Sequence, residues 1–146
     1  MFMGEYSHNI DAKGRLIVPA KLREELGTEF VVTEGADGCL YGYSKEGWQS
    51  VNEAFLSTPM SGKMSRELKR RVFSKASNVE IDKQGRILLS PKHREFAGLK
   101  KEVVFLGVLD RIEIWDKARL DECENKVNED ELDEILETLS EKGLNF

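Results

Sequence analysis

The chain has 146 residues, 40% of them hydrophobic and 34% charged, which is typical of a globular protein large enough to bury a core. Its net charge of −5 does not exclude a nucleic-acid partner, because the acidic residues are unevenly distributed along the chain. Residues 116–146 contain eleven acidic and four basic side chains, so residues 1–115 are slightly basic. No nearly apolar run is longer than Val103 to Leu109, which is too short to cross a bilayer.

The first five residues contain neither the basic nor the apolar segment of a secretory signal. Cys39 and Cys123 are far apart, lack metal-binding spacing and have apolar neighbours, which predicts buried free thiols in a reducing compartment. We therefore expect a cytoplasmic protein that makes no contact with a membrane.

In chain order, the β-branched and aromatic residues predict eight short strands, four in each half of the chain. The predicted strands span 5–10, 15–18, 30–33, 39–43, 78–81, 86–89, 102–107 and 111–115. In both halves a short helix separates the second and third strands. The helix of the second half has Ser90 as N-cap and proline at its first position. Gly27 and Gly98 are expected to end these helices in the left-handed conformation.

Three further helices are predicted outside these two strand sets. One begins after Ser44 and ends before Pro59, and a second begins at Ser61 and carries a basic face. The third begins after Asn128, whose side chain is expected to cap it, and has three acidic residues in its first turn.

The two halves contain the same segment at a constant offset of 71 residues. Of the 14 positions from Ile10 to Arg23, six are identical in Ile81 to Arg94, and three more exchange one aliphatic residue for another. A repeat of this kind usually means that one structural unit is used twice. We predict an α+β, β-rich fold with a first unit and trailing helix over 1–58, a connecting basic helix over 59–74, a second unit over 75–119 and an acidic helical segment over 120–146.

Each copy contains a short turn that begins with aspartate and ends with glycine. The aspartate accepts a hydrogen bond from a backbone N–H two residues later, and the glycine takes a positive φ and closes a hairpin. We therefore assign a structural role in the turns to Asp11, Gly14, Asp82 and Gly85.

Cationic side chains surround both turns. An arginine on a short, rigid hairpin can bind phosphate or pair with guanine in a major groove, and a β-ribbon is an established way to present it. The alternative is that each arginine pairs with the aspartate of its own turn, although an exposed ion pair contributes only about 0–1 kcal/mol. For the two arginines that follow in the helices, a structural ion pair is an equal alternative. The residues that we expect to contact DNA are Arg15, Lys13, Arg86, Lys83, Arg23, Lys21 and Arg94.

Signals of catalysis and of metal binding are weak. His8 and His93 have no partner at a metal-binding spacing, and no glycine-rich phosphate loop is present. The acidic residues from Glu122 to Glu137 have the spacing of a solvated helix face. We expect no enzymatic activity, no cofactor, no metal and no small-molecule substrate.

The run Asp-x-Lys-Gly-Arg-x-x-x-Pro that starts at Asp11, followed by Arg23, resembles the signature of the SpoVT-AbrB swapped-hairpin DNA-binding proteins. Two such units in one chain of this length, opening with Met-Phe-Met-Gly-Glu-Tyr, resemble the MraZ family of bacterial transcriptional regulators, which are encoded at the head of division and cell-wall gene clusters. The second copy departs from the signature, with Gln84 in place of lysine and Ser90 in place of proline.

This resemblance implies that the two units intertwine as an intramolecular pseudo-dimer with flanking helices and both turns on one face. It also implies a homo-oligomeric ring that binds double-stranded DNA at repeated boxes upstream of its own operon, in association with the nucleoid. The alternative function is that of an antitoxin-like protein-binding module of the same fold. The basic face from Lys63 to Arg71 either contacts DNA or faces water.

Overall fold

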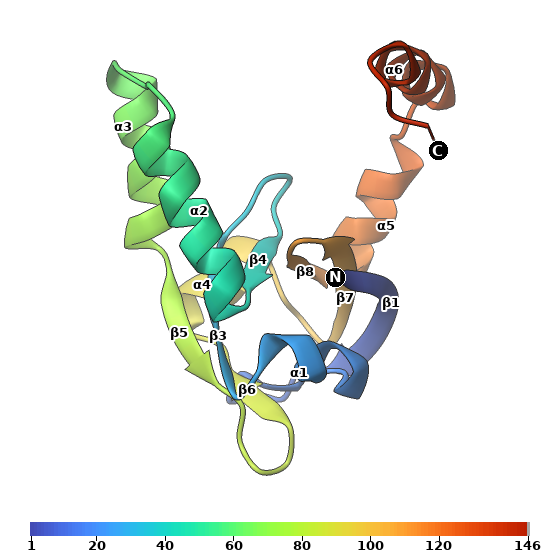
Figure 1. The fold of residues 1–146 in the computed structure, drawn as a ribbon. Helices are drawn as coiled ribbons and strands as arrows, with labels where there is room; N and C mark the ends of the chain where they lie inside the picture. Colours follow the sequence, from blue (N-terminus) through green and yellow to red (C-terminus); the bar gives the residue numbers. More distant parts are fainter. Residues whose placement is uncertain (146) are drawn as a thin grey trace.

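Strands from the two halves of the chain are interleaved within one sheet (Figure 1). The computed structural model describes residues 1–145. Six strands form an antiparallel sheet in the order β1-β7-β8-β4-β3-β5, and β2 and β6 pair separately as a two-stranded ribbon. The strands are β1 (Phe2–Asn9), β2 (Arg15–Ile17), β3 (Glu29–Glu34), β4 (Leu40–Tyr43), β5 (Ser77–Glu80), β6 (Arg86–Leu88), β7 (Glu102–Leu109) and β8 (Ile112–Asp116).

The first strand of each half pairs with the third strand of the other half. β1 lies against β7, β5 lies against β3, and β4 and β8 meet in the middle of the sheet. In the ribbon, Arg15 is opposite Leu88 and Ile17 is opposite Arg86, so the pairing is symmetric under the 71-residue offset. The predicted β-rich pseudo-dimer of two intertwined units is therefore confirmed.

The hydrophobic core lies beneath the ribbon and contains side chains from both units. Leu16 and Ile87, which face each other across the ribbon, are completely or almost completely buried. Just beyond the ribbon, the N–H of Val18 donates to the carbonyl of Gly85 (2.8 Å), and the N–H of Leu89 donates to the carbonyl of Gly14 (2.9 Å). The glycine of each turn thus accepts a hydrogen bond from the strand end that follows the other turn.

The short helices α1 (Ala20–Leu26) and α4 (Pro91–Ala97) occupy equivalent places in the two units. Ser90 caps α4 as predicted, because its hydroxyl accepts the N–H of His93 (3.1 Å), and Gly98 ends this helix in the left-handed conformation (φ 61°). The same prediction is wrong for Gly27, whose φ of 84° is combined with an extended ψ of −155°.

Between the units lie α2 (Lys45–Ser57), α3 (Lys63–Lys69) and the π-helical turn η1 (Arg70–Ser74). Ser44 caps α2 as predicted. The helix predicted to start at Ser61 begins two residues later, at Lys63: Gly62, with a φ of 91°, occupies the N-cap position, and no side chain caps this helix. Since η1 takes up residues that correspond to the start of β1, β5 has only four residues whereas β1 has eight.

The C-terminal part forms α5 (Lys117–Asn125) and α6 (Glu129–Glu141). Arg119 holds α5 on the body, since its Nη1 donates to the carbonyls of Gly38 and Phe96 (both 3.0 Å). Asn128 caps α6 as predicted, accepting the N–H of Glu131 (3.1 Å). In Figure 1, α5 and α6 form one arm, α2 and α3 form another, and the β5–β6 turn lies at the opposite end of the molecule.

Cys39 is buried as predicted, but Cys123 is only half-buried, and both are free thiols. Within residues 1–145, no helix combines the length and the apolar character that a membrane span requires.

We expect Leu16→Ala to lower the free energy of unfolding by about 2–5 kcal/mol, because it opens a cavity in the core shared by both units. The matched control is Ile17→Ala, whose side chain faces outward in the same strand and should change stability by less than about 0.5 kcal/mol. Trp48 and Trp115, one in each half, should report a single common transition in denaturant. Separate transitions for the two tryptophans would contradict the interlocked fold.

Candidate nucleic-acid interface

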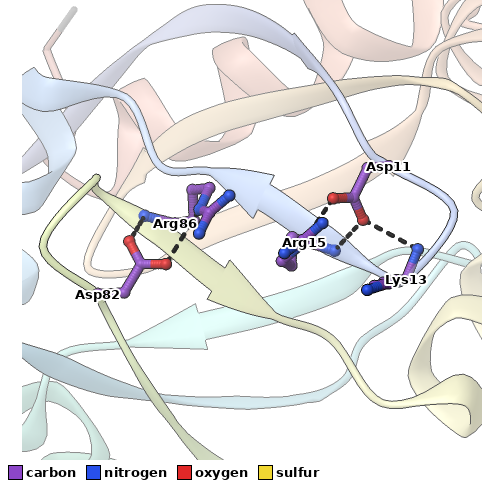
Figure 2. A network of polar contacts seen from close by, with 5 residues as sticks. All are labelled: Asp11, Lys13, Arg15, Asp82 and Arg86. Atoms are coloured by element: carbon purple, nitrogen blue, oxygen red, sulfur yellow. Dashed lines mark hydrogen bonds and ion pairs between the residues drawn. The ribbon is translucent and has the colours of Figure 1, made fainter.

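The two repeated turns have the same hydrogen-bond geometry (Figure 2). In the first turn, Asp11 Oδ1 accepts the N–H groups of Lys13 and Arg15 (both 2.9 Å), and Asp11 Oδ2 accepts Arg15 Nε (2.6 Å). In the second turn, Asp82 Oδ1 accepts the N–H groups of Gln84 and Arg86 (both 2.9 Å), and Asp82 Oδ2 accepts Arg86 Nε (3.0 Å). One carboxylate therefore closes the turn and orients the arginine that begins the next strand.

The aspartates hold these arginines by the inner nitrogen only. Each Nε is bonded to a carboxylate, whereas the Nη1 and Nη2 atoms of Arg15 and Arg86 have no hydrogen-bond partner among residues 1–145. The alternative raised by the sequence, a pairing of each arginine with its own aspartate, is thus present, but it uses one edge of each guanidinium. The outer pair of N–H groups remains available for a planar acceptor such as phosphate or guanine.

The hydrogen bonds from the N–H groups and guanidinium of Arg15 hold the pKa of Asp11 below its ordinary value of 3.8. The N–H and the guanidinium of Arg86 lower the pKa of Asp82 in the same way. Both carboxyl groups are solvent-exposed. They are therefore ionised throughout the physiological pH range, and so both arginines remain oriented.

The outer face of the β2–β6 ribbon carries a second feature, a pair of exposed aliphatic side chains. Because alternate residues of a strand point to opposite faces, Leu16 and Ile87 point inward, and Arg15, Ile17, Arg86 and Leu88 point outward. Ile17 is 41% exposed and Leu88 is 61% exposed. Each arginine is directly opposite an aliphatic residue of the other strand, so the face alternates between cationic and apolar groups.

Ile17 and Leu88 were not among the site residues expected from the sequence. The signal that would have found them is the aliphatic triplet Leu16-Ile17-Val18 and its counterpart Ile87-Leu88-Leu89. In a strand with one buried face, successive residues point to opposite faces, so at least one of three consecutive aliphatic residues must point to solvent.

Arg23 and Arg94 lie across the turn of the other unit. A methyl group added to Gly85 would collide with the guanidinium of Arg23, and one added to Gly14 would collide with that of Arg94. Arg94 Nε also donates to the carbonyl of Leu89 (3.2 Å). Within residues 1–145 neither arginine forms an ion pair. Each unit thus supports the other unit's turn, and the two glycines provide both the positive φ and the space for the arginine.

The lysines of the proposed site are exposed around the ribbon and take part in no ion pair within the described part of the chain: Lys13, Lys21, Lys83 and Lys92. His93 is buried and has a structural contact, since its Nε2 lies 2.6 Å from the carbonyl oxygen of Lys75. Among residues 1–145 there is no cluster of three histidine, cysteine or acidic side chains that could hold a metal ion.

Comparison with known proteins gives consistent results over the whole chain. The family model described as "MraZ protein, putative antitoxin-like" matches twice, over residues 1–71 and 72–142. A protein of Lachnoclostridium phytofermentans named Transcriptional regulator MraZ is 50% identical over 146 residues, which is all of both chains. A protein of the same name from Lactobacillus delbrueckii subsp. bulgaricus is 49% identical over 97% of this chain and 98% of its own length. Another, from Clostridium beijerinckii, is 45% identical over 99% of this chain and 100% of its own length.

The lowered pKa values of Asp11 and Asp82 predict how the turns respond to acid. The carboxylates contribute stability above the ordinary aspartate pKa, and this contribution is lost as the pH falls through the lower pKa of the folded state. An NMR titration of the side-chain carboxyl carbons should give midpoints below 3.8 for both residues. Midpoints of Asp11 and Asp82 at or above 3.8 would show that the turn hydrogen bonds do not persist in solution.

Proposed function

The chain belongs to the MraZ family, and on that basis we propose that it is a transcriptional regulator that binds double-stranded DNA in a sequence-specific way. The observation that carries this proposal is the pair of arginines on the β2–β6 ribbon, each oriented through Nε by an aspartate and each with its outer nitrogens unpaired within residues 1–145. The names of the relatives support the regulatory role.

The ribbon would enter a major groove with its outer face toward the bases. A guanidinium donates two parallel hydrogen bonds to the O6 and N7 atoms of guanine, and this contact contributes about 1–3 kcal/mol of discrimination against another base. Aspartates that fix Arg15 and Arg86 beforehand reduce the side-chain entropy that binding would otherwise cost. Ile17 and Leu88, next to them, are suited to pack against the methyl groups of thymine.

The other cations would position the ribbon on the duplex. The exposed lysines Lys13, Lys21, Lys83 and Lys92 would contact backbone phosphates, which fix register without reading sequence. Arg23 and Arg94 hold the opposite turns and would direct their remaining N–H groups to the same phosphates. The seven DNA-contacting residues expected from the sequence therefore divide into base-reading arginines and residues that position the ribbon. Lys92, an exposed lysine beside the second turn, joins the second group in this proposal.

Multiple copies of the ribbon in a homo-oligomeric ring would raise the affinity for repeated boxes, because binding of one ribbon raises the local concentration of the next. This matters for a site with few cations on a chain of net charge −5. The expected target is a set of repeats upstream of the protein's own division and cell-wall operon. The role is non-enzymatic, needs no cofactor, and places the protein in the cytoplasm in association with the nucleoid.

A second candidate function is protein binding of the antitoxin type, which the description of the family model and the exposed apolar side chains of α6 both favour. Hydrogen exchange distinguishes the two functions. A tail that wraps a toxin only on binding would exchange rapidly over residues 129–141 in the free protein, whereas a permanent helix would be protected.

We expect Arg15→Ala and Arg86→Ala each to weaken binding to the native upstream DNA by about 1–3 kcal/mol without loss of stability, because each removes one proposed base contact. The control, Lys126→Ala, also removes one positive charge, but from the end of α5, and should leave affinity within about twofold. Fluorescence anisotropy against native and scrambled duplexes at three salt concentrations measures the effect.

An unchanged affinity in both arginine variants would refute the proposed reading face. A loss that is equal on native and scrambled DNA, with a salt dependence that is about one unit shallower, would instead assign the arginines to phosphate contacts.

If Leu88 contacts a thymine methyl group, the effects of Leu88→Ala and of removing that methyl group on the free energy of DNA binding should not be additive. Replacing a box thymine by deoxyuridine should weaken wild-type binding measurably, and the same replacement should have no further effect on Leu88→Ala if Leu88 covers that methyl group. A deoxyuridine outside the boxes serves as the DNA control. Strict additivity at every box thymine, for both Leu88→Ala and Ile17→Ala, would show that the aliphatic pair does not contact bases.

A further inference from the structure

α6 has an apolar face that no other element of residues 1–145 buries. Its apolar residues Leu132, Ile135, Leu136 and Leu139 follow the spacing i, i+3, i+4 and i+7, which places them on one side of the helix. The first three are 44%, 55% and 41% exposed, respectively. The helix also carries seven acidic residues and no lysine or arginine. It is thus an amphipathic helix in which the remaining surface is uniformly negative.

The opposite arm contains a groove between α2 and η1. The groove has a volume of about 340 Å³ and is lined by Asn52, Phe55, Leu56, Lys69 and Phe73. Leu56 is 88% exposed at its edge. The ring of Phe73 lies 5.0 Å from that of Phe55 and 5.4 Å from that of Trp48, measured between centroids, so aromatic packing holds the two walls together. The groove is therefore apolar at its base and formed before any partner arrives.

The charge beside this groove is opposite to that of α6. From Lys63 to Ser74 there are five basic residues and one acidic residue. Arg66, Lys69 and Arg70 follow the spacing i, i+3 and i+4, are all exposed, and so form a basic row on one side of α3 and η1. Lys69 belongs to both the row and the groove. An acidic amphipathic helix thus matches this site in both polarity and charge.

A chain's own α6 is poorly placed to reach this groove. Arg119 fixes α5 on the body, and only three residues, 126–128, separate α5 from α6. The two arms point away from each other in Figure 1. The occupant must then come from another molecule, and a second copy of this chain supplies a helix with the required features.

We propose that α6 of one copy docks in the α2–η1 groove of a second copy, with its apolar row against Phe55, Leu56 and Phe73 and its acidic side chains toward the basic row. Helix and groove are different surfaces of the same chain, so the contact is heterologous. An open assembly then has one free helix at one end and one free groove at the other until it closes. This inference rests on the part of the proposed function that assigns an oligomer, and it identifies the surfaces that would form it.

Two variants test the contact from its two sides. The helix variant is Leu132→Ser/Ile135→Ser, and the groove variant is Arg66→Glu/Lys69→Glu; all four side chains are exposed, so the fold should persist by circular dichroism. Sedimentation velocity should show wild type as larger than a dimer and each variant as a monomer. The matched controls, Leu88→Ser and Lys126→Glu, change exposed residues outside both surfaces and should retain the wild-type mass.

Mixing the two variants is the decisive measurement. The groove variant still has an intact α6 and the helix variant still has an intact groove, so the mixture should form a 1:1 dimer that grows no further. A wild-type monomer, a variant that retains wild-type mass, or a mixture that remains monomeric would each overturn the proposal. A helix variant that is monomeric beside a groove variant that is not would indicate that α6 pairs with another α6 instead.

DNA binding provides a separate readout, because the ribbon and the arms lie at opposite ends of the molecule. Both variants should retain wild-type affinity for a duplex with a single box and lose about 10²-fold or more on a duplex with repeated boxes. If no DNA bound but the masses changed as expected, the proposed function would fail and the docking contact would stand. If the masses of the variants did not change but DNA still bound, the docking contact would fail and the proposed function would stand.

Discussion

The pairing of β2 with β6 is the constraint on which the rest of the structure depends. Each of these strands has three residues and cannot satisfy its backbone hydrogen bonds within its own unit. When they pair, Leu16 and Ile87 close one core that belongs to both units, and each turn bonds to the chain beyond the other turn. The exchange of β1 and β5 between the halves of the main sheet extends the same arrangement. Neither half therefore contains a complete hydrophobic core.

This shared core also determines the chemistry of the outer surface. The register that sends Leu16 and Ile87 inward sends Arg15 and Arg86 outward at diagonal positions on one small ribbon. The aspartates then hold each arginine by one nitrogen, while Arg23 and Arg94 cover the glycines of the opposite turns. A rigid turn with an open guanidinium is a consequence of contacts made between the units, because neither turn is supported from its own unit alone.

The two units are not equivalent outside the ribbon. The helical hairpin between them ends in η1, which shortens β5 and brings Phe73 against Phe55 and Trp48. The second unit continues into α5 and α6, which project as a separate arm. The symmetric part of the molecule thus carries the candidate DNA-binding face, and the asymmetric insertions carry the two surfaces that we assign to self-association.

Much of this architecture follows from local patterns in the sequence. The repeat, the eight strands, the Asp-to-Gly turns and the caps at Ser44, Ser90 and Asn128 depend on interactions between residues that are close in the chain, so composition and spacing were sufficient to predict them. Gly62 was missed as the residue that delays α3, since serine at position 61 is a good cap wherever the backbone allows it. Long-range relations were beyond such patterns: which strand pairs with which, that Arg23 and Arg94 cross to the opposite turn, and that Ile17 and Leu88 stay exposed beside the arginines. These features depend on pairing register and on contacts between distant parts of the chain, which only the folded structure defines.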